Sequence, residues 1–415
     1  MKIGGLGVSA LIIYSAGYSV FAATMSFTEP QAVAYALENN PTQRAVATFV
    51  AQAEGRYLQA GRWENPELKL QYATDRAFND EGERCYSVGF EQKFPITNRL
   101  RLEKRIARDE IELARAEVAN ASRLLAHQVA SAFIQIAELE AQMALRDELL
   151  ELYSSFADFV SSRVETGEAS SVELNQIKIE RYTVEQARQR FANEHAVGLS
   201  ELRQLMGLDS RDVMDVQHVF TLPSSIPELP IVTRSVVEAQ PAYRMKALLS
   251  EIAQQQVSVA KAKCWADIAI EVFYEEERGV DAPNGLGRDR FFGVGISVPL
   301  PLLDDRQGIV AERRARSDQF RYELQAVQSE LENEASLRRE QVLQLYTQVK
   351  AYDASLTQIV AKNLTDMQNA YAAGQIALTD LFRAQGQGFN VRSAHLSMLH
   401  DYEQAMIYWK SATAE

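Results

Sequence analysis

The chain has 415 residues, of which 24% are charged, and its formal net charge is −13. This acidic balance argues against nucleic-acid binding, because neutralising phosphates requires a basic face. The two cysteines and five histidines are scattered along the chain, which excludes a disulfide framework and offers no zinc-ligand spacing.

The N-terminus has the pattern of a secretory signal. Lys2 precedes an apolar run, rich in glycine and serine, that extends from Leu6 to Ala23 and ends in small residues suited to signal peptidase. We expect residues 1–23 to be removed. The run is short for a membrane anchor, and no later run is long enough to cross a bilayer as a helix. No cysteine follows it, so no lipid anchor is expected. A mature chain in a membrane must therefore lie there as strands.

The first half, residues 24–208, begins with helices and continues into a strand hairpin. Thr28 followed by Gln31 resembles a capping box and predicts a helix start. From about residue 67 to 95 the period changes to two, with a polar loop in the middle. This alternation predicts two strands with one apolar and one polar face.

A long helical hairpin follows at about 99–206. Residues 99–165 fit one heptad frame, interrupted at Arg115, Ser122 and Arg146. Its length is about 100 Å at 1.5 Å per residue. Gly167 interrupts the pattern, and a second helix runs to about Met206. These features predict two long antiparallel helices.

The second half repeats the first. Residues 209–235 are proline-rich and are interpreted as a linker or equatorial segment. Residues 236–415 then give a helix, strands at about 266–300 and a helical hairpin at about 308–412. Asp304 and Asp305 suggest a turn or cap before the long helix. A seam that includes Val349, Tyr352 and Leu356 predicts that this helix is continuous to Gly374. A repeated pattern of this kind indicates a duplicated architecture.

We therefore expect a mainly α fold with a small β part. Four strands cannot close a barrel, since about eight are the practical minimum, and open edges are not tolerated in lipid. Three copies would supply twelve strands and a tube of long helical hairpins. Such an assembly is a conduit.

Six segments carry a family resemblance, and they cover nearly the whole mature chain. The sequence resembles the outer-membrane efflux protein family typified by TolC. The second and fifth segments are most similar to its heavy-metal resistance (CzcC-like) branch. The segments are FTEPQAVAYALENNP, LQAGRWENPEL, GFEQKFPITNR, VETGEASSVEL, SVPLPLLDDRQG and YAAGQIALTDL.

The resemblance implies a homotrimeric channel-tunnel in the outer membrane of a Gram-negative bacterium, with a large periplasmic part. Its implied partners are outer-membrane lipid, a periplasmic adaptor (membrane fusion) protein and an inner-membrane RND-type pump. The channel would be a passive duct, with heavy-metal cations as the expected cargo and no cofactor. Drug or solvent efflux and type I protein secretion stay open as alternatives.

The resemblance also implies a periplasmic gate of acidic side chains. Asp380 lies six residues after Gly374, and Glu173 lies six after Gly167. Arg383 stands where some members have a second acid. The alternative is that both acids are ordinary first-turn residues, which the helix dipole favours. The strands offer lipid-facing or girdle candidates: Tyr72, Tyr86, Phe90, Tyr274 and Phe292.

Two other classes of protein fit the sequence less well. An enzyme is not expected, because no phosphate loop, nucleophile elbow or dinucleotide fingerprint occurs. His395 and His400 are five residues apart and do not share a helical face, so no metal site is expected. A structural coiled coil would explain the heptads, but it leaves the four alternating strands unexplained.

Overall fold

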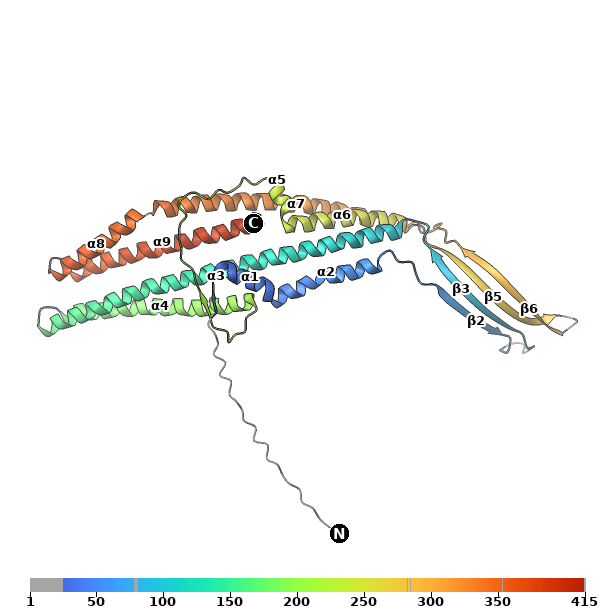
Figure 1. The fold of residues 1–415 in the computed structure, drawn as a ribbon, viewed down its shortest axis with the longest axis horizontal. Helices are drawn as coiled ribbons and strands as arrows, with labels where there is room; N and C mark the ends of the chain where they lie inside the picture. The colour runs from blue at the N-terminus through green and yellow to red at the C-terminus, as the bar shows by residue number, and fades with distance from the viewer. Residues whose placement is uncertain (1–24, 78–80, 282, 284, 353, 414–415) are drawn as a thin grey trace, which may run out of the picture.

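A computed structural model describes residues 25–77, 81–281, 283, 285–352 and 354–413. The predicted signal peptide, 1–23, lies outside the described residues. The molecule is elongated: long helices form its body and a small sheet stands at one end (Figure 1). The predicted fold class, mainly α with a small β part, is confirmed. Among the residues described, no helix is long and apolar enough to cross a bilayer.

The elements follow the same order twice along the chain, helices first, then a strand hairpin, then a long helical hairpin. The first set comprises β1 Met25–Phe27, α1 Glu29–Asn39, α2 Pro41–Gln59, β2 Glu67–Thr74, β3 Arg84–Phe94, α3 Arg99–Glu165 and α4 Ser171–Met206. The second comprises β4 Met214–Val216, α5 Arg234–Ala239, α6 Pro241–Ala262, β5 Ile268–Asp281, β6 Gly285–Ser297, α7 Gln307–Ala351, α8 Ala354–Ala372 and α9 Leu378–Thr413.

Local side-chain contacts start several of these helices. The backbone N–H of Thr28 donates to Gln31 Oε1 at 2.9 Å, which confirms the predicted capping box of α1. The backbone N–H groups of Arg306 and Gln307 donate to the carboxylates of Asp304 and Asp305, at 2.9 and 3.1 Å. The predicted turn before α7 is therefore formed by these two aspartates.

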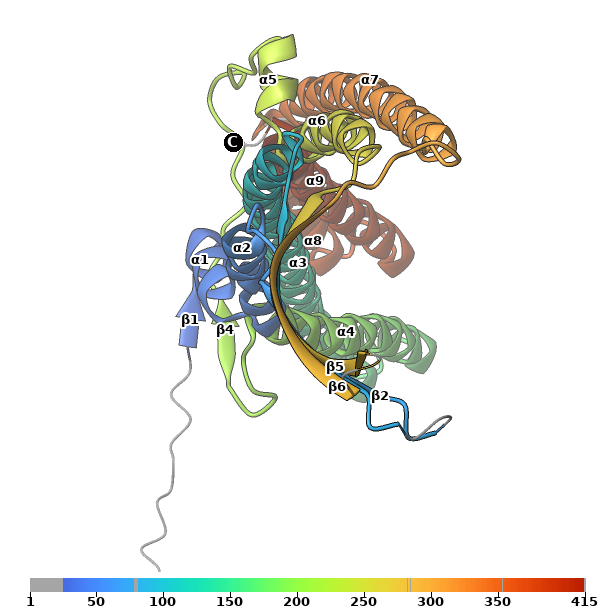
Figure 2. The same ribbon diagram turned by 90° about the vertical axis from the view of Figure 1, so that its right-hand side faces the viewer.

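The four longer strands make one antiparallel sheet in the order β2-β3-β5-β6. The central β3–β5 pairing joins the two halves of the chain, with Arg84 opposite Arg278 and Phe94 opposite Ile268. The sheet is strongly curved (Figure 2). Within the described residues β2 and β6 each have a partner on one side only, so the sheet has two open edges.

A second, small ladder was not predicted. β1 pairs in parallel with β4, which lies inside the segment interpreted as a linker. The rest of that segment, residues 217–233, packs across the helices, and we call it the strap. Tyr346 Oη donates to the carbonyl of Pro223 at 3.3 Å, and Arg339 Nε to that of Leu229 at 3.3 Å. The strap therefore belongs to the packed body.

The prediction of one continuous helix up to Gly374 is wrong. α7 ends at Ala351 and α8 begins at Ala354, whereas α3 is unbroken over 67 residues. Tyr352 has φ −82° and ψ 13°, outside the α-helical range. Its ring stacks on His395 of α9, with centroids 6.2 Å apart. The heptad pattern within one helix does not predict a contact of this kind with another helix.

Candidate functional site

One face of the sheet is apolar and exposed, and we call it the apolar face. Cross-strand neighbours line it in rows, for example Leu70, Val88, Tyr274 and Phe292. All five predicted lipid-facing or girdle residues lie on it and are exposed. Along β3 it extends from Phe94 to residue 86, eight steps of about 3.3 Å. The resulting height of about 26 Å matches the apolar band of outer-membrane strands, about 25 Å.

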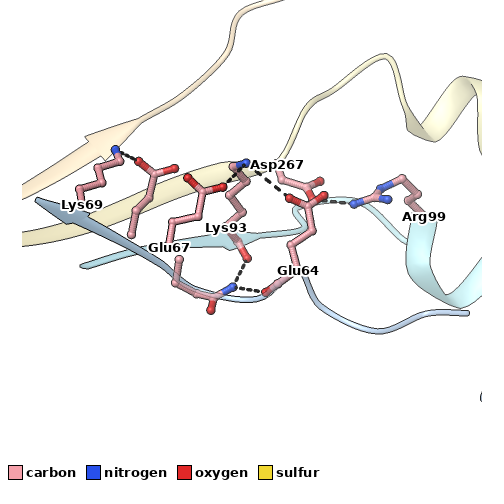
Figure 3. A network of polar contacts seen from close by, with 8 residues as sticks. Glu64, Glu67, Lys69, Lys93, Arg99 and Asp267 are labelled. Carbon is pink, nitrogen blue, oxygen red and sulfur yellow. Dashed lines mark hydrogen bonds and ion pairs between the residues drawn. The ribbon is translucent and has the colours of Figure 1, made fainter. Parts of the chain in front are cut away.

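The opposite face of the sheet is charged, and we call it the inner face. Lys69 pairs with Glu91 and, at 3.5 Å, with Glu271. Lys93 pairs with Glu67 at 3.3 Å and with Glu64 at 3.5 Å (Figure 3). Acids outnumber these lysines on the strands. The strand acids of this face are Glu67, Glu91, Glu271, Glu275, Glu277 and Asp289.

An aromatic side chain also lies on the inner face. A Cβ atom added to Gly293 would come within 2.4 Å of Phe273 Cζ. The tip of the Phe273 ring therefore occupies the space above Gly293, its cross-strand neighbour. This position is available only because residue 293 has no side chain.

Ion pairs join the sheet to the helices. Arg99, the first residue of α3, lies 2.6 Å from Asp267 (Figure 3). It also lies 3.5 Å from Glu103. Lys263, at the end of α6, lies 2.9 Å from Glu103. Arg99 and Asp267 are largely shielded from water, with 18% and 14% of their side chains exposed. This network ties the first helix after the sheet to the strand hairpin of the other half.

The far end of the molecule consists of two helical turns, one from each half (Figure 1). Gly167, between α3 and α4, has φ 78°, and Gly374, between α8 and α9, has φ 70°. The N–H of Glu168 donates to the carbonyl of Arg163 at 2.8 Å, and that of Gln375 to Ala370 at 2.9 Å. Both turns are Schellman motifs, which place glycine in the left-handed region.

The gate candidates lie just beyond these turns. Glu173 is in the first turn of α4, and Asp380 in the first turn of α9. Arg383 NH1 lies 3.5 Å from Asp380 Oδ1 on the same helix. Burial raises the pKa of the Tyr371 hydroxyl, with a further contribution from the negative charge of Glu173. Glu173 of one hairpin therefore lies close to a buried tyrosine of the other.

An apolar cluster packs the two hairpins together at this end. Tyr371 contacts Phe156 edge-on, with ring centroids 6.3 Å apart. The end formed by the two turns is therefore a packed unit within one chain. Its buried members are Val160, Ile177, Tyr371, Leu378 and Leu381.

A polar network between α3 and α9 was missed in the sequence. Ser393 Oγ donates to Gln142 Oε1 at 2.9 Å, and Ser397 Oγ to Glu138 Oε1 at 2.9 Å. Arg146, one turn on, is buried and donates to the Gln142 carbonyl at 2.8 Å. Burial lowers the pKa of the Arg146 guanidinium. The only sequence signal was the interruption of the heptad at Arg146.

Histidine and cysteine side chains form no cluster. Within the described residues no group of three metal-ligating side chains occurs. His395 stacks on Tyr352, and His400 Nδ1 lies 3.2 Å from Asp401. Cys85 and Cys264 are free thiols. Ion pairing and helix packing account for these histidine contacts.

Residues 32–208 match the family described as "Outer membrane efflux protein". Over 382 residues the chain is 23% identical to the cobalt-zinc-cadmium resistance protein CzcC of Cupriavidus metallidurans, covering 90% of this chain and 87% of that one. Two solved structures have the same fold. CusC is 16% identical with a TM-score of 0.77, covering 93% of this chain and 91% of that one. The outer membrane protein VceC of Vibrio cholerae is 18% identical with a TM-score of 0.73, covering 93% and 95%.

Proposed function

We propose that this chain belongs to the outer membrane efflux protein family, whose model matches residues 32–208, and that it is one subunit of a passive outer-membrane channel. The channel is the exit of an efflux system and carries out no chemical reaction. Its helical body extends into the periplasm, with the two glycine turns at the far end. There it meets a periplasmic adaptor protein and an inner-membrane pump of the RND type, which supplies the energy.

One observation carries this proposal: the sheet has an apolar outer surface, a charged inner surface and two open edges. Lipid does not tolerate unpaired strand edges. If β6 of each copy pairs with β2 of the next, three copies complete a closed sheet of twelve strands. In a barrel of about eight strands the side chains just fill the interior, so twelve strands leave an open lumen. The inner face then lines the opening, and the apolar face contacts lipid.

Two features favour heavy-metal cations as the cargo. The first is the similarity to a protein named for cobalt, zinc and cadmium resistance. The second is the excess of acids on the inner face, where, among the strand side chains that the structure describes, only Lys69 and Lys93 oppose six carboxylates. A pore wall of this sign concentrates cations. Neutral drugs or solvents, or an exported protein, would gain nothing from it.

In the trimer, Asp380 and Glu173 form the candidate gate at the periplasmic end. Three copies bring three of each carboxylate around the axis. The nearby Arg383 reduces the local negative charge, since it lies 3.5 Å from Asp380. The ring is therefore weaker than one made of acids alone, and Gly167 and Gly374 set the sharp turns that carry it.

Two experiments test the channel and its cargo separately. Membrane fractionation with detergent extraction tests the channel: we expect the protein in the outer membrane as a heat-modifiable trimer, and release by salt alone would contradict this. Growth of a strain lacking the gene tests the cargo, on salts of cobalt, zinc, cadmium, copper and silver and on dyes, detergents and drugs. Sensitivity confined to the metals supports cation efflux, whereas sensitivity confined to the organic compounds contradicts it.

A further inference from the structure

Three arginines form a row across the sheet, beyond the aromatic part of the apolar face. Arg84 on β3 is directly opposite Arg278 on β5, which is directly opposite Arg288 on β6. They share the apolar face with Tyr86, because residues two apart on a strand point to the same side. We call these three residues the arginine row. It lies at the end of the sheet remote from the helices (Figure 1).

Like charges directly opposite each other destabilise a sheet. Arg288 Nε lies 3.2 Å from Glu276, and Arg290 Nε lies 3.2 Å from the same carboxylate. Within the described residues no ion pair involves Arg84 or Arg278. Arg84 lies over the ring of Tyr86, 5.9 Å from its centroid. This part of the face therefore carries four arginines and one glutamate, and the glutamate pairs with only two of them, Arg288 and Arg290.

Nearby carboxylates do not neutralise the row. Asp75 accepts the backbone N–H of Gly82 at 3.0 Å, and Glu83 accepts that of Val280 at 2.9 Å. Asp75 therefore holds the loop backbone, and Glu83 holds the end of β5. Glu277 precedes Arg278 on the strand and so belongs to the inner face. A hollow of about 220 Å³ beside Arg84 and Arg278 is also lined by Asp75, Glu83 and Glu277, so a phosphate would bind on the open side of the row and not in this hollow.

We propose that the arginine row binds the phosphates of a phosphorylated glycolipid in the outer leaflet, the headgroup chemistry of lipid A. The proposal rests on the proposed function, which puts the apolar face in lipid and the helices in the periplasm. Guanidinium groups bind phosphate through paired hydrogen bonds. The row is next to Tyr72 and Tyr86, whose rings lie 4.9 Å apart, and aromatic rings of this kind mark the boundary between acyl chains and headgroups.

The test measures lipid binding and thermal stability of the full-length trimer in phosphatidylcholine nanodiscs, with and without diphosphoryl lipid A. The variant is Arg84→Gln/Arg278→Gln. The control, Arg115→Gln/Arg321→Gln, removes the same charge from exposed helical positions whose ion pairs lie within one helix turn. Dephosphorylated lipid A and free inorganic phosphate serve as competitors.

We expect wild type and control to bind diphosphoryl lipid A at least tenfold more tightly than the row variant. Lipid A should raise the unfolding temperature of wild type and leave that of the row variant unchanged. Without lipid A the row variant should be no less stable than wild type, because repulsion between Arg84 and Arg278 has been removed. The stability of the row variant without lipid A therefore distinguishes loss of the lipid site from damage to the fold.

Three results would overturn the inference: equal binding by wild type and the row variant, equal binding of dephosphorylated lipid A, or equal losses in row variant and control. Competition by millimolar inorganic phosphate alone would indicate a general anion site and would also contradict a lipid headgroup. Failure of the proposed channel is recognised separately, because the protein would then be absent from the outer-membrane fraction.

Discussion

The guanidinium carbon of Arg146 lies 3.9 Å from the centre of the Phe191 ring, and Phe389 faces it at 5.2 Å. Arg146 is on α3, Phe191 on α4 and Phe389 on α9, so one buried cation joins the two helical hairpins of the chain. Its charge is stabilised by two aromatic faces and by Gln142, whose side-chain oxygen lies 2.9 Å away. No carboxylate accompanies it in an ion pair among the residues described.

Replacing this cation should destabilise the helical body. We expect Arg146→Ala to lower the free energy of unfolding by about 2 kcal/mol, because a desolvated cation–π contact contributes about that much. Arg188→Ala is the control: its partner Asp147 is exposed, and surface ion pairs contribute about 0–1 kcal/mol. Thermal unfolding of the detergent-solubilised protein provides the measurement. Equal effects of the two changes would show that Arg146 has no special role.

The space around two glycines predicts opposite effects of replacing them by alanine, because Gly293 lies against Phe273 and Gly308 faces open space. Gly293→Ala should destabilise the sheet by about 1–3 kcal/mol, since the new methyl group overlaps the ring. Gly308→Ala should stabilise α7 by about 0.5–1 kcal/mol, because no atom lies within 4 Å of the added carbon. Unfolding of both variants, and of Gly293→Ala combined with Phe273→Ala, tests this. A neutral Gly293→Ala would contradict it.

The candidate gate predicts a channel phenotype. Divalent cations added on the periplasmic side should reduce the conductance of the wild-type protein reconstituted in planar bilayers. Asp380→Asn should weaken this block about tenfold, which corresponds to about 1.4 kcal/mol, because one carboxylate per subunit is lost. Arg383→Glu should strengthen it. Asp366→Asn, an exposed acid on α8, is the control, and block that is unchanged in Asp380→Asn would remove this residue from the gate.

The environment of His127 predicts part of the pH dependence of folding stability. Burial lowers the pKa of His127, and the charges of Arg123 and Arg338 lower it further, while Glu334 opposes them. The unfolded chain, with a histidine pKa of about 6.5, therefore binds the proton more readily than the folded one. Stability should fall as the pH drops below about 6.5, by at most about 1.4 kcal/mol per pH unit from this group.

His127→Gln tests this sign. The variant should lose that part of the slope, whatever its stability at neutral pH. Unfolding temperatures measured between pH 5 and 8 provide the comparison, and identical slopes for His127→Gln and wild type would contradict the assignment.

Features that depend on neighbours in sequence were predictable. The capping box at Thr28, the aspartate turn before α7 and the alternation that separates the two faces of the sheet each involve residues within a few positions of one another. Glycine at 167 and 374 follows the same rule, because a Schellman motif is complete within six residues.

Features that depend on distant partners were not predictable. The β1–β4 ladder is three residues long and joins Met25 to Met214, too short to show an alternating pattern. The break after α7 lies where Tyr352 stacks on His395 of α9. The polar network at Gln142 of α3 needs Ser393, which is also on α9. In each case both partners are residue types that also occur on protein surfaces. Neither segment by itself therefore indicates that the contact exists.

The pairing of β3 with β5 also sets an order of events during folding. It joins Arg84 to Arg278, whereas the two helices of a hairpin, such as α3 and α4, follow each other directly in the chain. Contacts between residues far apart in the chain form slowly, because a long loop must close before they contribute. We therefore expect the helices to form first and the complete sheet last. A newly made subunit would then travel through water without its full apolar face and assemble that face only on reaching the membrane.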